Sequence, residues 1–266
     1  MTKLAIYFLN LVLRCHHDQI LERAAGLTYR ILLAFFPFII FLVSLLGMLH
    51  VDESALLEGL FFALPMEIAN FVRGFLQELS KSKTAGLMST ALFFTLYNTS
   101  NGFRAIIRMT NRAYGMDERW RLAYQIGLSF LLMLLFAGAI VIMLAFLVFG
   151  RQLLGVFFPK GNEMLHAVAA AGGALVVLTL VTMIIYKLAC GAPLRLRHVL
   201  PGAIFAVAAW MVASGGFGFV ISNFTQLPVV YGSVAGVFIL ILWLNTVSIV
   251  LLIGNEANVL LREYFP

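Results

Sequence analysis

Residues 122–149 read LAYQIGLSFLLMLLFAGAIVIMLAFLVF, a stretch without a charged side chain that decides the fold class of this chain. A helix rises about 1.5 Å per residue and the hydrocarbon core of a bilayer is about 30 Å thick, so about 20 apolar residues can cross it. This stretch is longer than a perpendicular crossing requires, which predicts that its helix tilts or continues beyond the membrane interface. The sequence therefore indicates a membrane protein.

Apolar stretches of similar length recur on both sides of this one. Because 62% of the 266 residues are hydrophobic and 11% are charged, the chain has too little polar surface to cover a soluble globule. We expect an all-α polytopic membrane protein, a single domain over residues 1–266 with about six transmembrane helices. The expected spans are residues 28–49, 84–103, 122–149, 164–188, 199–221 and 234–253.

Three segments lie outside the expected spans. Residues 1–27 begin with an apolar run too short to cross a bilayer, which favours an amphipathic helix on the cytoplasmic membrane surface. In the outer loop, residues 50–83, apolar and polar residues recur at helical spacing after Pro65, which predicts a second amphipathic helix. That helix either rests on the outer interface or forms a lid over an outward opening. Residues 254–266 are expected to form a cytoplasmic tail.

The distribution of cations predicts the orientation, because Lys and Arg in short loops remain in the cytoplasm. With the N-terminus inside, thirteen of the 18 Lys and Arg residues lie on the cytoplasmic side. We therefore expect a multi-pass membrane protein with both termini in the cytoplasm. The net charge of +6 then reflects topology, and no nucleic-acid partner is expected. The five cations left outside are Arg73, Lys81, Lys83, Arg151 and Lys160.

A row of polar residues follows the second expected span. Asn98, Asn101, Arg104 and Arg108 stand at steps of three or four residues, so they share one helix face. Such a row either holds helices together, with arginines that extend to the interface, or lines a water-accessible cationic groove that attracts an anionic group.

A second polar row lies at the end of the last expected span, formed by Asn245, Asn255, Glu256 and Asn258. A carboxylate near the membrane requires a partner, and the candidates are Arg30, Arg104 and Arg108. We expect Arg104 and Glu256 to form one polar site near the cytoplasmic end of the bundle. The pair either locks the bundle or breaks during a transport cycle.

Other residues bear on packing and metal binding. Pro37 removes a backbone hydrogen bond inside the first span, which predicts a kink. Small residues at multiples of four from Gly202 to Ser222 predict close helix contact. Cys15, His16, His17 and Asp18 are adjacent in sequence, but neighbours on a helix point in different directions, so we expect no metal and no cofactor.

Three motifs give the chain a family resemblance. They are Ala25-Gly26-Leu27-Thr28-Tyr29 leading to Phe36-Pro37, Gly102-Phe103-Arg104-Ala105 with Asn111-Arg112-Ala113-Tyr114-Gly115, and Tyr231-Gly232-Ser233 through Leu242-Trp243-Leu244 to Gly254-Asn255-Glu256-Ala257-Asn258. Their order and separation resemble the YihY/virulence factor BrkB family. The resemblance implies a bacterial inner-membrane protein, and some members are historically named ribonuclease BN. It also implies a role in transport or envelope traits, including export of lipid precursors and serum resistance.

The residues favour transport over catalysis. The five histidines are scattered, and the chain contains neither an H-x-H-x-D-H cluster nor a phosphate-binding G-x-x-x-x-G-K-[ST] loop. We therefore expect no catalytic residues and no ATPase of its own, and the resemblance together with the polar rows implies a transporter or exporter of a lipid-like or anionic solute. The alternative is a non-transporting membrane scaffold. The expected partners are membrane lipids and the solute itself, and no oligomeric state follows from the sequence.

The orientation is testable by labelling. Cysteines introduced into residues 67–83 should react with a membrane-impermeant thiol reagent added from outside, because that loop carries few of the cations. Cysteines near Arg119 or Arg195 should not react. The reverse labelling pattern would overturn the orientation.

Overall fold

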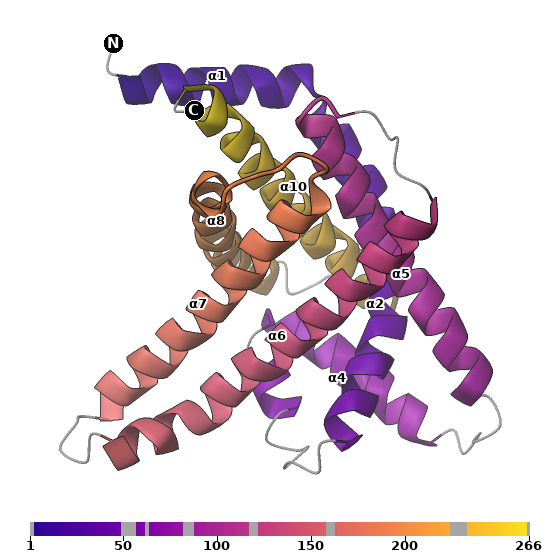
Figure 1. The fold of residues 1–266 in the computed structure, drawn as a ribbon. Coiled ribbons are helices and arrows are strands. Elements are labelled where there is room, and N and C mark those ends of the chain that lie inside the picture. Colours follow the sequence, from indigo (N-terminus) through magenta and orange to yellow (C-terminus); the bar gives the residue numbers. More distant parts are fainter. Residues whose placement is uncertain are drawn as a thin grey trace.

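The computed structural model describes residues 3–48, 57–61, 64–81, 88–116, 122–157, 163–223 and 233–264, and these ranges contain helices and no strand. The all-α expectation is confirmed. The long helices, labelled in Figure 1, are α1 (Lys3–His17), α2 (Ile20–Met48), α4 (Met66–Lys81), α5 (Met88–Ala113), α6 (Leu122–Phe157), α7 (Glu163–Ala189), α8 (Leu196–Asn223) and α10 (Ser233–Tyr264).

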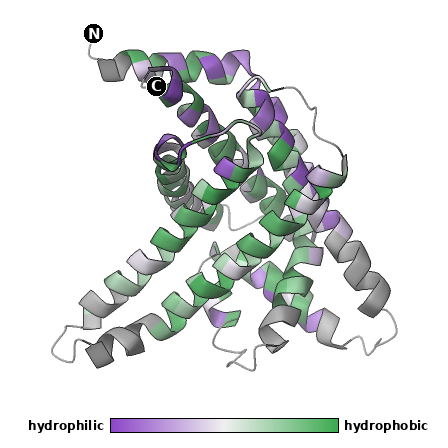
Figure 2. Ribbon diagram, viewed as in Figure 1, coloured by the Kyte–Doolittle hydropathy of each residue, from purple (hydrophilic) through white to green (hydrophobic). Residues whose placement is uncertain are grey.

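The helices form a bundle that is closed at one end and spread at the other. Helix α1 lies across the end that carries both termini, and α6 and α7 run side by side away from it (Figure 1). Hydrophilic residues gather at the end with the termini, whereas the middles of the long helices are hydrophobic (Figure 2). This separation is the one expected of a bundle whose middle lies in hydrocarbon.

Among the described residues, five helices are long and apolar enough to cross a membrane: Ile20–Val43, Ala123–Phe149, Val168–Ala189, Leu196–Ile221 and Ala235–Tyr264. The expected span at residues 84–103 falls partly on α5, which is not among them. The polar and charged residues from Asn98 onward lower the hydropathy of α5, although it is long enough and packs inside the bundle against α2 and α6. The count of six spans stays a prediction.

One expected segment is corrected by the structure. Residues 254–266 are not a tail, because α10 continues to Tyr264 and its residues Gly254 to Leu260 are all buried. Helix α2 begins at Ile20, before the expected span, and α6 continues past residue 149 to Phe157, in line with the length of its apolar stretch. At the end of α10 the reason is tertiary packing, which extends a helix where its next turn finds a neighbour.

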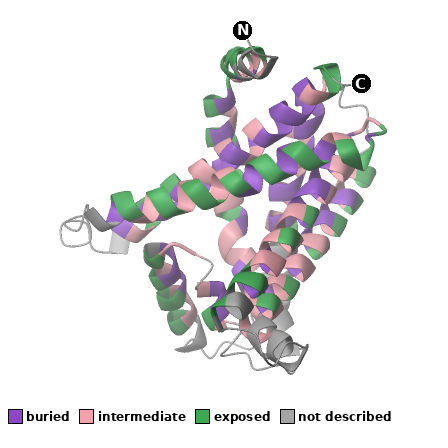
Figure 3. Ribbon diagram, turned by 90° about the vertical axis from the view of Figure 1, so that its left-hand side faces the viewer, coloured by how far each residue is buried: buried purple, intermediate pink, exposed green. Residues whose placement is uncertain are grey.

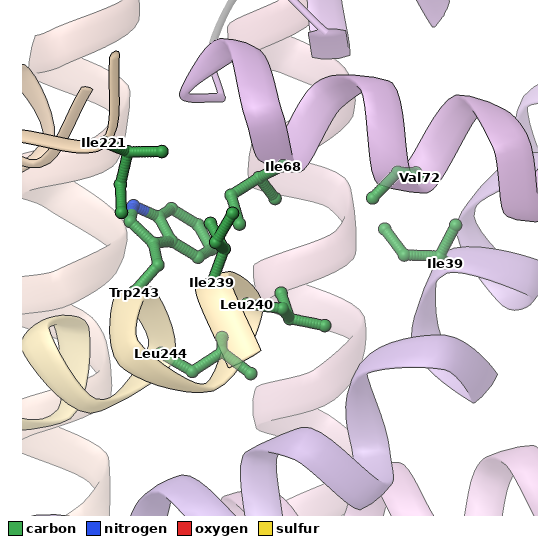
Figure 4. Close-up of a cluster of buried hydrophobic side chains, with 8 residues drawn as sticks. All are labelled: Ile39, Ile68, Val72, Ile221, Ile239, Leu240, Trp243 and Leu244. Atoms are coloured by element: carbon green, nitrogen blue, oxygen red, sulfur yellow. The ribbon is translucent and has the colours of Figure 1, made fainter. Parts of the chain in front are cut away.

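Helix α4 is the amphipathic helix predicted in the outer loop. Ile68 and Val72 are buried, and Asn70 and Arg73 are exposed. The buried face packs onto α2 and α10 in a cluster around Trp243 (Figure 4). Figure 3 shows the opposite face of α4 exposed along its length. Whether α4 acts as a lid stays a prediction.

Helices α8 and α10 approach each other most closely at two glycines. A Cβ on Gly254 would lie 2.8 Å from both the Ala206 Cβ and the Gly202 carbonyl oxygen, and one on Gly202 would collide with Gly254 and Asn258. The small-residue contact predicted for this helix is therefore confirmed at Gly202 and Ala206. It does not continue to Gly218, where a Cβ would meet nothing within 4 Å.

Two further features shape the bundle ends. Gln19 adopts a left-handed conformation with φ of 51° between α1 and α2, and this turn lets α1 leave the direction of α2. Pro37 lies inside α2, where it cannot donate to the carbonyl four residues earlier. The kink expected there stays a prediction.

Alanine substitutions test the α8–α10 contact. Gly202→Ala should lower the stability of the purified protein by about 1–3 kcal/mol, because the added methyl forces two backbones apart. Gly215→Ala, on the same helix where a Cβ meets nothing within 4 Å, should be neutral or stabilising by up to about 1 kcal/mol. Thermal unfolding in detergent measures both, and equal melting temperatures would contradict the close approach.

Candidate functional site: a central cavity and the polar residues of α10

A cavity of about 310 Å³ lies between α2, α5, α6, α7, α8 and α10. Its wall is almost wholly aliphatic and aromatic, and none of the described residues that line it is charged. The side chains in the wall with a hydrogen-bonding group are Thr99, Thr110, Thr182, Tyr186, Trp210, Trp243 and Asn255. The cavity is therefore an apolar chamber with a few hydrogen-bonding groups.

The polar groups of the cavity wall differ in whether they have partners. The Thr182 hydroxyl donates to the Leu178 carbonyl at 2.8 Å, and the Tyr186 hydroxyl donates to the Leu251 carbonyl at 2.7 Å. In contrast, three buried side chains find no partner: the Thr99 hydroxyl, the Trp243 indole N–H and both polar atoms of the Asn255 amide. The cavity thus presents unused hydrogen-bonding capacity.

The remaining polar residues of the α10 row each reach a different neighbour. Asn245 Oδ1 lies 3.2 Å from the Thr28 hydroxyl of α2. Asn258 Oδ1 accepts a hydrogen bond of 2.7 Å from the Gly202 backbone N–H of α8. Both contacts pair the side-chain oxygen in a region where water is scarce, so these two residues hold helices together, while Asn258 Nδ2 is buried without a partner.

Glu256 is 1% exposed and binds α1. Arg14 Nε donates to Glu256 Oε2 at 2.9 Å, Arg14 Nη1 donates to Glu263 at 2.7 Å, and Arg14 Nη2 donates to the Ala113 carbonyl at 3.2 Å. One guanidinium therefore ties α1 to α10 and to the end of α5.

The structure corrects the expected pairing of Arg104 with Glu256. Arg104 hydrogen-bonds to Asn101 one turn earlier on α5, and its guanidinium lies 5.7 Å from the centre of the Tyr97 ring. The sequence interpretation missed Arg14, which it counted only as a cytoplasmic cation. The sequence signal for it was the apolar Leu11, which lies one turn before Arg14 on the same helix face. In the structure Leu11 is buried against α10, so the face that carries Arg14 is turned toward the bundle.

The row on α5 lies outside the cavity wall. Asn98, Asn101, Arg104 and Arg108 are half-buried and none lines the cavity. The wall is formed instead by the neighbouring face of α5, with Thr99, Gly102, Phe103, Ile106 and Thr110. Of the eight residues proposed from sequence, Asn255 is the one that lines the cavity.

A second, open recess of about 760 Å³ lies at the end of the bundle with the termini. It is lined by Arg14, Arg112 and Arg262 together with Asp18 and Glu263. Arg112 and Arg262 are exposed and form no ion pair within the described part of the chain. The recess therefore mixes both signs of charge, with cations in excess.

The junction of α1 and α10 also contains a thiol. Burial raises the pKa of the Cys15 thiol to about 11, and the nearby Glu256 carboxylate adds to the shift. Because thiolates and not thiols are alkylated, Cys15 should be unreactive near neutral pH while α1 is docked. No group of three or more His, Cys, Asp or Glu that could hold a metal ion occurs in the described ranges.

Comparisons with known proteins agree on a family. A family model described as Virulence factor BrkB matches residues 11–265. The "Putative ribonuclease-like protein YfkH" of Bacillus subtilis (strain 168) is 30% identical over 253 residues, which cover 93% of this chain and 91% of that protein.

Longer relatives are also similar. A UPF0761 membrane protein of Xanthomonas campestris pv. campestris (strain B100) is 28% identical over 246 residues, which cover 89% of this chain and 56% of the relative. One from Xanthomonas oryzae pv. oryzae (strain PXO99A) is 27% identical over 260 residues, which cover 94% of this chain and 59% of the relative. The chain thus spans less than two thirds of these Xanthomonas proteins. No solved structure matches it.

The Arg14 contacts predict that Arg14→Ala and Glu263→Ala lower the stability of the protein by different amounts. Arg14→Ala should lower stability by about 2–3 kcal/mol, because it leaves the buried Glu256 carboxylate alone, and the 23% exposure of the Arg14 side chain reduces the loss. Glu263→Ala should cost less than about 1 kcal/mol, since Glu263 is exposed.

The rate of Cys15 alkylation also reports the contact of Arg14 with α10. It is measured with Cys190 replaced by Ser, so that Cys15 is the thiol that reacts. In the otherwise native protein the rate should keep rising with pH toward about pH 11, because burial disfavours the thiolate. In Arg14→Ala it should be faster at pH 8, and in Glu263→Ala unchanged. An equal rate in all three would show that Arg14 does not hold α1 in place.

Proposed function

Because this chain belongs to the virulence factor BrkB family of membrane proteins, we propose that it is a transporter that takes a lipid-like molecule into its central cavity. It works without an ATPase of its own. In this proposal it resides in the bacterial inner membrane with both termini in the cytoplasm. The position of both termini at one end of the bundle (Figure 1) supports an even number of crossings, with α5 as the sixth.

The observation that carries the proposal is the cavity. A volume of about 310 Å³ falls at the lower end of the range of about 300–1,000 Å³ found for ligand pockets. Protein interiors are otherwise close-packed, and an empty cavity lowers stability. A scaffold whose polar residues only join helices has no use for such a space, so the cavity favours transport over the scaffold alternative.

The chemistry of the wall favours a lipid-like ligand over an anionic solute. Apolar cavities of this kind stay dry and bind apolar molecules, whereas an unpaired charge pays a large penalty on leaving water. Arg112 and Arg262, which form no ion pair within the described residues and could bind an anion, line the separate end recess. An anionic group would therefore remain in that recess while a hydrocarbon chain enters the cavity.

The proposal contains no enzymatic step. The ribonuclease-like name belongs to the Bacillus relative, and the other relatives are named only as membrane proteins. None of the described residues in the cavity wall has a charged or imidazole side chain that could act as a general acid or base.

Filling the cavity tests the proposal. Met143 lines the cavity, and the adjacent Ile142 is 52% exposed on the outside of α6. Met143→Trp should abolish most of the lipid that remains bound after detergent purification, because the indole occupies the cavity. Ile142→Trp, the matched control, should retain it.

The measurement is mass spectrometry of lipid extracted from purified protein of equal monodispersity. Ile140→Phe, a smaller filling of the same wall, replaces Met143→Trp if that variant does not fold. Equal lipid content in the filled variant and the Ile142→Trp control would refute a lipid-binding cavity.

A further inference from the structure

Asn255 differs from Asn245 and Asn258, the other amides of the polar row on α10. It is 2% exposed, it lines the central cavity, and neither its Oδ1 nor its Nδ2 has a hydrogen-bond partner. Asn245, which is half-buried, and Asn258 each bind a neighbouring helix through Oδ1, and of these two only Asn258 has an unpaired buried atom, its Nδ2. Asn255 therefore offers both a donor and an acceptor to the cavity and uses neither within the protein.

An amide in that condition destabilises the protein that carries it. Burying polar atoms without partners costs free energy, and native proteins contain few such groups. A leucine of similar size would fill the same space without the cost. A group that makes the empty protein less stable is typical of a binding site, because the ligand supplies the missing partner.

We propose that Asn255 binds a polar group of the ligand inside the cavity, and that this group is an uncharged hydroxyl, ester or amide on a long apolar chain. This inference rests on the proposed function, since it assigns the ligand class of the same cavity. The amide N–H₂ donates to an oxygen of the ligand, and Oδ1 accepts a hydrogen bond where the ligand carries a hydroxyl or N–H.

The absence of charge from the cavity wall selects a neutral group. No described residue that lines the cavity is acidic or basic, and one amide cannot offset the cost of taking a phosphate or carboxylate out of water. A neutral hydrogen-bonding group is matched by one amide. A charged headgroup, where the ligand has one, stays outside the cavity.

Two further unpaired groups extend the site along the cavity. The Trp243 N–H lies on α10 twelve residues before Asn255, which is about 18 Å along a helix axis. The Thr99 hydroxyl lies on α5, and it lacks even the bond to the carbonyl one turn earlier that Thr28, Thr182 and Ser248 make. The hydrogen-bonding groups are thus spread along an apolar chamber, which suits an elongated molecule.

The first test is the stability of the protein freed of lipid. Asn255→Leu should raise the melting temperature in detergent by about 2–4 °C, because it removes an unpaired amide. The matched control Asn258→Leu should lower it, because the Gly202 N–H loses its acceptor. A lower melting temperature in Asn255→Leu would show that Asn255 serves the fold, and would overturn the inference.

The second test is ligand selectivity, which a structural role would not change. Tritiated 1-hexadecanol bound to purified protein is displaced by unlabelled 1-hexadecanol or by hexadecane, with Met143→Trp as the background. In the native protein the alcohol should displace the label at about tenfold lower concentration than the alkane. In Asn255→Leu the two should be equally effective.

The outcomes separate this inference from the proposed function. If both competitors displace the label equally in the native protein and in Asn255→Leu, the cavity binds an apolar chain, and the assignment of Asn255 is wrong. If the native protein binds no more label than Met143→Trp, the cavity takes no such chain, and both proposals fall.

Discussion

The fold depends on hydrogen bonds from polar side chains of α10 to three other helices, in a region where little water is available. Glu256 binds Arg14 of α1, Asn258 Oδ1 binds the Gly202 backbone of α8, and Asn245 binds Thr28 of α2. Each bond reaches a different helix. A single helix therefore fixes the positions of three others, because a slip of any of them would leave a polar group unpaired in hydrocarbon.

These contacts hold the helices together on both sides of the central cavity. At the end with the termini, α1 is held by Arg14, and α8 approaches α10 to backbone contact at Gly202 and Gly254. At the other end, Ile68 and Val72 of α4 pack with Trp243, which also lines the cavity. Between these contacts the helices line an apolar cavity in which Asn255 remains unpaired. An apolar cavity between helices held in this way suits a lipid-like molecule.

Much of the fold follows from the sequence, because the thickness of the bilayer sets the length of each apolar helix. Composition and period therefore predicted the helices, including amphipathic α4, and small residues predicted the contact at Gly202. The expected cytoplasmic tail was wrong, since the turns of α10 from Gly254 to Leu260 are helical and buried against neighbours. The site was predicted less well for a related reason. Periodicity groups Asn98, Asn101, Arg104 and Arg108 on one face, but it does not say which way that face turns or that Arg14, 242 residues from Glu256 in sequence, is the partner.

The most direct test of the account is a cryo-electron microscopy map of the protein purified into lipid nanodiscs. The account predicts elongated density in the chamber between α5 and α10, in contact with the Asn255 amide and continuing toward Trp243. A map in which the helices close on each other and fill the chamber would contradict it, and so would a chamber that contains only separate water peaks.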